Sequence, residues 1–363
     1  MILTIILVIL SISALIILHE FGHFIIAKKF GVKVEEFGIG YPPRIFGKKI
    51  GETIYSINLL PLGGFVKILG EEERKNDPKS FSSKPLWQRS LIILGGVINF
   101  WIIAIVLFSI VFSMGAPVAV GDNEVGNFTN PHIEILSVQK DSPAEKAGLQ
   151  MGDIIEKFKV GDKEIAVNKV ANFLELTKEY SGQEVGLVVK RGKEDVSVNL
   201  VPRVSPPPGQ GAMGISLARV AFQSYSFPRS IWMGIKYTGV LTARIFVSLG
   251  QLFYRLIRGQ GMPAGMEPAS ILGIFYFFYK AAQLGTIYFL QFVAMISVYL
   301  AVFNILPIPA LDGGKLLFLG IEGIRKKPIS QKIENNVTLA FFVLLIALVV
   351  FVTFRFDIPR FIK

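Results

Sequence analysis

A five-residue stretch near the N-terminus has the residue types and the spacing of a metal-dependent hydrolase site. His19-Glu20-Phe21-Gly22-His23 is an H-E-x-x-H pattern. On a helix the two histidines stand four positions apart, so both imidazoles leave one face about one turn apart. Their nitrogens can then reach a single Zn²⁺ at about 2.0–2.1 Å. Glu20 lies beside them and can act as general base toward a water at the metal.

The position of this pattern in the chain favours a metal site. It ends an apolar run from Met1 to Ala27, and an ionisable residue inside a bilayer costs about 2.5–3.5 kcal/mol. Three such residues in one turn need a compensating partner, which a metal ion supplies. The alternative is a helix end whose histidines and glutamate only reach the water at the membrane interface.

A third protein ligand must come from elsewhere, because catalytic zinc sites usually have three. The chain has no cysteine, and its third histidine, His132, lies in a polar segment without a metal-spaced partner. The candidate is Asp312, which ends another apolar run on the same predicted side of the membrane as His23. Two prolines before it break the helix, and the glycine pair after it allows close backbone approach. The alternative is a solvated aspartate in a Pro/Gly turn.

The composition indicates a membrane protein. Of the 363 residues, 52% are hydrophobic and 18% are charged, which excludes a disordered chain. The apolar residues gather into runs near the spanning length of about 20 residues, which excludes a single soluble domain. We expect four transmembrane spans, at 1–27, 91–116, 284–306 and 337–354.

The net charge of +11 is consistent with a membrane protein, because the basic residues lie beside the ends of the apolar runs. Basic residues gather between 28 and 89 and between 315 and 336, beside the ends of the spans, and such clusters mark the cytoplasmic side. Both termini are then expected outside. We expect no nucleic-acid partner, because the polar segments contain no basic helix interleaved with aromatic residues.

A polar, glycine-punctuated segment separates the second and third runs. The ranges 185–190 and 196–200 alternate as strands do. The ranges 142–148 and 172–180 have the signals of short helices, and the first of them begins with Ser142 as N-cap. We therefore expect a soluble domain of both helices and strands in this segment.

These patterns divide the chain into three parts. The first part of the membrane core is expected at 1–116, the soluble domain at 117–217 and the second part of the core at 218–363. Within this last part, 229–258 is apolar but interrupted by basic residues. Such a segment predicts an amphipathic helix that lies in the membrane interface rather than a fifth span.

Two stretches together identify a family. His19 to His23 resembles the zinc motif, and 304–314 resembles the N-x-x-P-x-P-x-L-D-G motif, of the site-2 protease family of intramembrane zinc metalloproteases (peptidase M50), in its bacterial RseP-like branch. The resemblance covers nearly the whole chain. It implies that His19, His23 and Asp312 are zinc ligands and that Glu20 is the general base. It also implies that Asn304 is catalytic, binding the substrate or the developing oxyanion.

Two further segments resemble substrate-binding parts of the family. The range 53–70 resembles its membrane-associated β-hairpin, which implies that Gly63, Gly64 and Phe65 contact an extended substrate. An ordinary cytosolic hairpin is the alternative. The range 95–100 resembles the family's glycine-asparagine motif, which implies a substrate contact for Asn99. Helix packing alone explains these glycines equally well.

The soluble segment resembles an HtrA-like PDZ domain at 142–149 and 152–155. PDZ domains bind peptides by β-augmentation and hold a terminal carboxylate on backbone N–H groups. The resemblance implies a peptide-binding loop at Met213, Gly214 and Ile215. RseP itself has two tandem PDZ domains, whereas this chain has room for one.

The resulting expectation is a mainly α-helical multi-pass membrane protein with an inserted α+β PDZ domain. The family implies an intramembrane zinc endopeptidase of a bacterial inner membrane that acts in regulated intramembrane proteolysis. Its active site would face the cytoplasm, and its PDZ domain the opposite side. Its substrates would be membrane proteins with a single transmembrane segment, such as anti-sigma factors or remnant signal peptides.

Two other classes of protein compete with this expectation. An inactive, PDZ-bearing membrane adaptor would have lost its base or a ligand, whereas Glu20 and the three candidate ligands are intact. A metal transporter would line an ion pathway with polar residues, and no chain of such residues crosses the other apolar runs.

Overall fold

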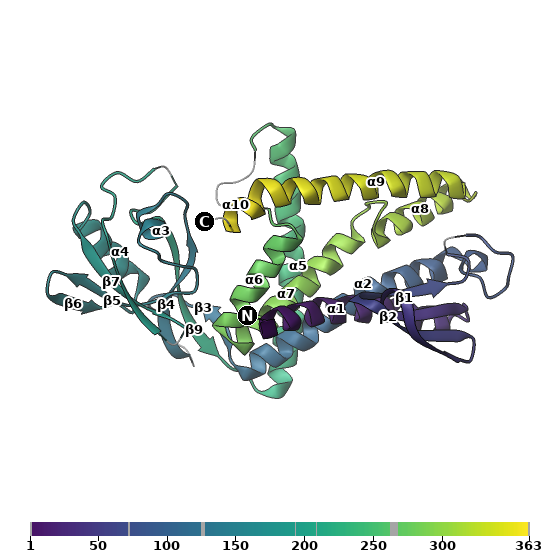
Figure 1. Ribbon diagram of the computed structural model, residues 1–363, viewed down its shortest axis with the longest axis horizontal. Coiled ribbons are helices and arrows are strands. Elements are labelled where there is room, and N and C mark those ends of the chain that lie inside the picture. Colours follow the sequence, from purple (N-terminus) through teal and green to yellow (C-terminus); the bar gives the residue numbers. More distant parts are fainter. Residues whose placement is uncertain are drawn as a thin grey trace.

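The computed structural model describes residues 2–71, 73–124, 128–192, 194–207, 209–261 and 268–361. Long helices form the middle of the molecule, and a large β-sheet lies at one end of them (Figure 1). A small sheet lies at the opposite end, beside the first helix (Figure 1). The main helices are α1 (Ile2–Lys29), α2 (Leu86–Met114), α5 (Phe227–Ile257), α6 (Ile271–Leu284), α7 (Thr286–Ile305), α8 (Asp312–Arg325) and α9 (Gln331–Val352).

Within the described residues, five helices are long and apolar enough to cross a membrane. Four of them, at Ile5–Lys29, Leu86–Met114, Thr286–Ile305 and Gln331–Asp357, coincide with the four runs expected from the sequence. The fifth is α5, whose segment was expected to lie in the interface. Length and hydropathy alone therefore admit five spans. Figure 1 shows α5 crossing α1, α2 and α9 steeply instead of running along them.

The ends of the first two helices follow from local chemistry. Lys28 and Lys29 occupy the last turn of α1, where cations complement the helix dipole. Gly31 follows with φ +65°, a conformation that glycine adopts without strain. Helix α2 begins after Pro85 and ends at Gly115, whose φ is +105°.

Helices α1 and α2 cross where a glycine of each faces the other. A Cβ atom at Gly22 would lie 2.7 Å from the carbonyl carbon of Gly95, and a Cβ at Gly95 would lie 2.6 Å from the oxygen of Gly22. Only glycine allows this separation, as in other close helix pairs of membranes. Helix α7 joins α2 through Ser297, whose Oγ donates to the carbonyl of Phe100 at 2.7 Å.

The small sheet consists of β1 (Val34–Ile50) and β2 (Thr53–Ile68). Residues 34–39 of β1 pair with 64–68 of β2 on one side and with 54–57 on the other, and 44–50 pair with 53–58. The two halves of 53–70 therefore do not form the expected hairpin with each other, because β1 lies between them. The tight turn is instead at Gly51, with φ +63°, which joins β1 to β2.

The large sheet contains seven strands in the order β3-β9-β4-β5-β7-β8, with β6 paired to β5. Its strands are β3 (Ala116–Ala119), β4 (Thr129–Val138), β5 (Ile154–Val160), β6 (Lys163–Ala166), β7 (Val185–Arg191), β8 (Glu194–Leu200) and β9 (Ile215–Gln223). Two helices accompany it, α3 (Pro143–Lys146) and α4 (Val170–Glu179). The strands expected at 185–190 and 196–200, and both expected helices, are confirmed.

Local capping explains α3. Ser142 accepts a hydrogen bond from the Glu145 N–H at 3.1 Å, and Pro143 is the first helical residue. At the far end of the domain, β9 pairs with both β3 and β4 and continues to Gln223. The domain boundary expected at residue 217 thus falls inside this strand.

Candidate metal centre

Three side chains that are far apart in the sequence meet between α1 and the start of α8. The Nε2 atoms of His19 and His23 lie 3.2 Å apart. Oδ2 of Asp312 lies 3.2 Å from the His19 Nε2 atom and 3.4 Å from that of His23. Both histidines are 8% exposed. Within the described residues this is the one group of three His, Asp or Glu side chains arranged to hold a metal ion.

The three distances fit one tetrahedral ion. Ligands at about 2.0–2.1 Å from Zn²⁺ at tetrahedral angles stand roughly 3.3 Å from one another. The three observed separations, 3.2, 3.2 and 3.4 Å, match that edge length. Two imidazole nitrogens and one carboxylate oxygen are also ligands that zinc accepts. The residues present therefore fit a zinc ion.

Helix α2 orients both imidazoles. Nδ1 of His23 donates to the carbonyl oxygen of Ile92 at 2.9 Å, which leaves Nε2 free to bind a metal. The His19 ring stacks on Phe100, with centroids 4.5 Å apart. Between these contacts lies Gly96, where a Cβ atom would stand 2.6 Å from His19 Nδ1. The glycine thus leaves the space that the two rings occupy.

The backbone around Asp312 is folded tightly, so that this first residue of α8 faces the histidines. The chain leaves α7 at Ile305 and re-enters a helix only seven residues later. Cβ atoms at the next two glycines would collide with this returning backbone: one at Gly313 would lie 2.6 Å from the carbonyl carbon of Ile305, and one at Gly314 2.7 Å from that of Ile308. The glycine pair is what permits the return.

Glu20 connects the centre to the small sheet. Its Oε2 atom accepts a hydrogen bond from the backbone N–H of Val66 at 3.1 Å. A groove of about 400 Å³ runs past this point, and its lining includes Glu20, His23 and Asp312 together with residues 65–68 of β2. The cluster of candidate ligands thus opens onto the edge of a β-strand.

The other substrate-contact candidates in β2 lie beside α1. The N–H of Gly63 donates to Ser13 Oγ at 3.2 Å, and that hydroxyl donates to the Pro61 carbonyl at 3.0 Å. A Cβ at Gly64 would lie 3.1 Å from the Ile17 side chain. These glycines bring β2 against the helix that carries the histidines, while Phe65 lines the groove.

The two asparagines are partly buried, and each donates to a backbone carbonyl of a helix. Asn99 donates from Nδ2 to the carbonyl oxygen of Leu18, and so links α2 to α1 one residue before His19. Asn304 donates to the Leu300 carbonyl of its own helix at 2.9 Å. In these positions Asn99 supports the helix crossing, and Asn304 lies at the end of α7. Their roles toward a substrate stay predictions.

The expected peptide loop belongs to the large sheet, away from the metal centre. Met213 is 2% exposed and packs in the core of the soluble domain, and its carbonyl accepts from the Ala144 N–H at 3.1 Å. Gly214 has φ +74° and donates to the Gly211 carbonyl at 3.0 Å. Ile215 begins β9. The side chain of Met213 is thus occupied by the core.

Several contributors to the site have no signal of their own in the sequence. The Val66 N–H and the Ile92 carbonyl are backbone groups, and Gly96 is one glycine among 35. An ion pair between Glu71 and Lys315, with Oε1 and Nζ 2.5 Å apart, also borders the groove. Lys315 is the part of this pair that the sequence indicates, because it stands three residues after Asp312 and so on the same side of the helix.

Comparison with known proteins gives consistent results. The sequence profile of peptidase family M50 matches residues 7–348. A protein of Clostridium perfringens named as a candidate zinc metalloprotease is 36% identical over 351 residues, with 97% of each chain covered. Zinc metalloprotease RasP of Oceanobacillus iheyensis is 26% identical, with 98% of this chain and 99% of the relative covered. Regulator of sigma-W protease RasP of Bacillus subtilis is 27% identical, with 98% of both covered.

Among solved structures, the PDZ domain of an SdrC-like protein from Listeria monocytogenes is similar at 23% sequence identity and a TM-score of 0.21. The matched region covers 24% of this chain and 90% of the Listeria domain. The family profile, by contrast, spans almost the whole chain, as does the relative that is 36% identical. The chain therefore belongs to peptidase family M50, the site-2 proteases, and is a membrane-embedded zinc metalloprotease.

Proposed function

We propose that this protease cleaves peptide bonds within the transmembrane segments of other membrane proteins. The observation that carries the proposal is the place of the His19, His23 and Asp312 cluster. It lies toward the C-terminal end of an apolar helix and opens onto a groove beside an edge strand. Ionisable residues in a membrane-spanning helix cost free energy, so metal ligands at this place indicate a reaction that takes place within the membrane.

The proposed topology has four spans, α1, α2, α7 and α9, with α5 in the outer membrane interface. Basic residues at the ends of α1 and α8, including Lys29 and Arg325, support a cytoplasmic location for the metal centre. The large sheet lies at the other end of the helices (Figure 1), which supports an extracytoplasmic soluble domain. The steep crossing of α5, and its amphipathic sequence, favour the interface over a fifth span.

The chemistry follows from the residues around the centre. His19, His23 and Asp312 would hold Zn²⁺, which when bound polarises a scissile carbonyl and activates water as the nucleophile. Glu20 takes the proton of the attacking water and delivers it to the leaving amine. The hydrogen bond from the Val66 N–H holds the Glu20 carboxylate toward the groove. Asn304 is proposed to bind the substrate carbonyl as it becomes an oxyanion.

A transmembrane helix hides its amides, so the substrate must be unwound before cleavage. Residues 64–68 of β2 pair with β1 on one side only, which leaves their other edge toward Glu20. We propose that the unwound substrate pairs with this edge by β-augmentation. Phe65 borders the groove there, and Gly63, Gly64 and Asn99 hold the strand and helices in place. Glycine or proline in the substrate span would make unwinding less costly.

The soluble domain is proposed to be a PDZ domain that filters substrates and takes no part in the chemistry. Its antiparallel sheet with helices α3 and α4, and the Ser142 cap, support this. A peptide C-terminus is proposed to bind at the loop of Met213, Gly214 and Ile215, and it would have to replace the Gly211 carbonyl as the acceptor of the Gly214 N–H. Single-span membrane proteins are the proposed substrates, anti-sigma factors or remnant signal peptides among them. The Bacillus relative's name, a regulator of sigma-W protease, favours the first class.

Glu20→Gln tests the proposed mechanism. The variant should retain zinc and the fold, because an amide keeps the size of the side chain and its oxygen still accepts from Val66 N–H. Cleavage of a transmembrane peptide in detergent micelles should fall by about 10²–10⁴-fold, the usual contribution of a general base. Full activity in this variant would refute the role of Glu20. Loss of zinc together with activity would make Glu20 a ligand instead.

A further inference from the structure

We propose that the ion pair between Glu71 and Lys315 positions the metal centre, by fixing Asp312 and the β2 edge strand relative to the two histidines. This inference rests on the proposed zinc ligands and adds two residues that act through them. Neither Glu71 nor Lys315 reaches the candidate ligands by a hydrogen bond or ion pair of its own side chain. Both are therefore positioning residues.

The pair joins two elements that must be held together. Lys315 stands three residues after Asp312, almost one turn along α8 and on the same side of the helix. Glu71 stands three residues after Ile68, the end of β2. With Nζ and Oε1 2.5 Å apart, the pair links the helix that presents the third ligand to the strand whose Val66 N–H holds Glu20.

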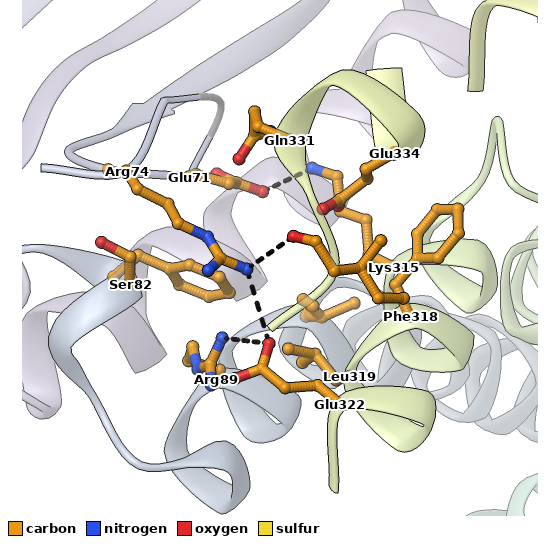
Figure 2. A pocket seen from close by; sticks show the side chains of 14 residues that line it. Glu71, Arg74, Ser82, Arg89, Lys315, Phe318, Leu319, Glu322, Gln331 and Glu334 are labelled. Carbon is orange, nitrogen blue, oxygen red and sulfur yellow. Dashed lines mark hydrogen bonds and ion pairs between the residues drawn. The ribbon is translucent and has the colours of Figure 1, made fainter. Parts of the chain in front are cut away.

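The pair also borders two spaces. Glu71 and Lys315 line the groove of about 400 Å³ that His23 and Asp312 also line. They also line a small pocket of about 40 Å³, shown in Figure 2. The Glu71 side chain is 16% exposed and that of Lys315 is 44% exposed, so the carboxylate is the more shielded partner. Loss of the pair would open the wall of the groove next to Asp312.

A second ion pair holds the far end of α8. Glu322 accepts from Arg89 at 2.5 and 3.2 Å, and Arg74 stands 3.7 Å from the same carboxylate (Figure 2). Arg89 lies on α2 one turn before Ile92, the residue whose carbonyl orients His23. Helix α8 is thus tied to α2 through Glu322 and to β2 through Lys315. These are the two elements that orient His23 and Glu20.

A positioning role explains why an ion pair, rather than two apolar residues, joins α8 to the end of β2. Replacing a partly buried ion pair by apolar residues is often neutral for stability, so stability alone is a weak reason for it. Residues behind metal ligands, in contrast, typically change metal affinity about 10–100-fold when they are altered. Asp312 follows a turn that contains two prolines, so its location depends on where α8 is held.

Zinc affinity of the full chain in detergent tests the inference, with Glu71→Gln and Lys315→Met as single variants. Each should weaken Zn²⁺ binding about 10–100-fold, and the double variant should lose no more than either single one, because both break one pair. Lys315→Arg should stay within a few-fold of the parent, since it keeps the pair. The visible absorption of the Co²⁺-loaded protein should change in the single variants, which reports altered ligand geometry directly.

The matched control is the pair of Lys79 and Glu52, which has the same chemistry at 2.6 Å but side chains that are 54% and 49% exposed. Lys79→Met should leave Zn²⁺ affinity and the Co²⁺ spectrum unchanged. Parental affinity and spectrum in Glu71→Gln would overturn the inference, as would additive losses in the double variant. Asp312→Ala separates this failure from that of the zinc site itself. If Asp312→Ala keeps zinc, the proposed ligand set is wrong; if it loses zinc while Glu71→Gln does not, only the positioning role falls.

Discussion

The Nδ1 atom of His23 on α1 lies 2.9 Å from the carbonyl oxygen of Ile92 on α2. Because a carbonyl can only accept, Nδ1 must carry the proton, and the lone pair of Nε2 faces His19 and Asp312. One backbone group of the second helix thus sets the tautomer of a ligand on the first. The distance between α1 and α2 therefore matters for the metal as well as for packing.

Gly96→Ala tests this coupling between helix packing and the metal centre. The added methyl would lie 2.6 Å from His19 Nδ1, so the imidazoles or the helices must move. Zinc affinity should fall by about tenfold or more, as for other changes behind metal ligands. Equilibrium dialysis of the purified variant against Zn²⁺ measures it. Gly320→Ala in α8, where a Cβ meets nothing within 4 Å, is the control and should bind zinc normally.

Asp312→Ala should remove most bound zinc, because two histidines cannot fill a site that needs three protein ligands. Atomic absorption of the purified protein gives the zinc content. Glu322→Ala is the comparison: it loosens α8 but removes no ligand, so it should retain more zinc. Glu267, another carboxylate suitable for comparison, lies outside the described residues. Wild-type zinc content in Asp312→Ala would reassign the third ligand.

The parts of the site that sequence could predict are those fixed by local geometry. Helical spacing brings His19 and His23 together, and the shortage of cysteine and histidine leaves few choices besides Asp312. The bond between Val66 N–H and Glu20 joins residues 46 positions apart. It depends on how β2 packs against α1, which no local pattern encodes. Glu71 and Lys315 are more distant still, at 244 positions.

The small sheet and α5 show two further limits. Prolines, glycines and lysines between Gly38 and Lys49 hide the alternation of β1. The sequence therefore predicts two strands within 53–70 that pair with each other, whereas both pair with β1. The mean hydropathy of α5 reaches 1.4, against 2.0 to 3.0 for the other four long helices. A value of this size suits either a span or an interfacial helix, and orientation is a property of packing.

The contact of His132 with Glu134 predicts a pH-dependent stability of the soluble domain. His132 Nε2 lies 3.6 Å from the Glu134 carboxylate, which raises the pKa of the imidazole against the opposing effect of burial. The protonated imidazole stabilises the fold. This stabilisation is complete below the ordinary histidine pKa of about 6.5 and is lost as the pH rises through the raised pKa. Relative to His132→Gln, the wild-type unfolding temperature should therefore fall above about pH 6.5. Parallel pH curves for the two proteins would contradict this.

Removing the soluble domain tests whether it only filters substrates. Strand β3 begins at Ala116 and β9 ends at Gln223, and the two pair along their whole shared length. Removal of 116–223 therefore takes out the complete sheet, whereas removal of 117–217 leaves six residues of β9 without their partners, a segment prone to association. With a short linker, the first deletion should still cleave a minimal transmembrane peptide in detergent at a rate close to that of the full chain.

Deletion of 117–217 is the matched control for deletion of 116–223. It should yield less monodisperse protein by size-exclusion chromatography. Glu134 also accepts a hydrogen bond from the Tyr288 hydroxyl of α7 at 3.2 Å, so the soluble domain touches the membrane core as well. Tyr288→Phe in the full chain removes that bond alone and should leave cleavage of the minimal peptide unchanged. If the 116–223 deletion stays folded and keeps its zinc but no longer cleaves the minimal peptide, the soluble domain does more than filter, because the intact metal centre would then need it for turnover.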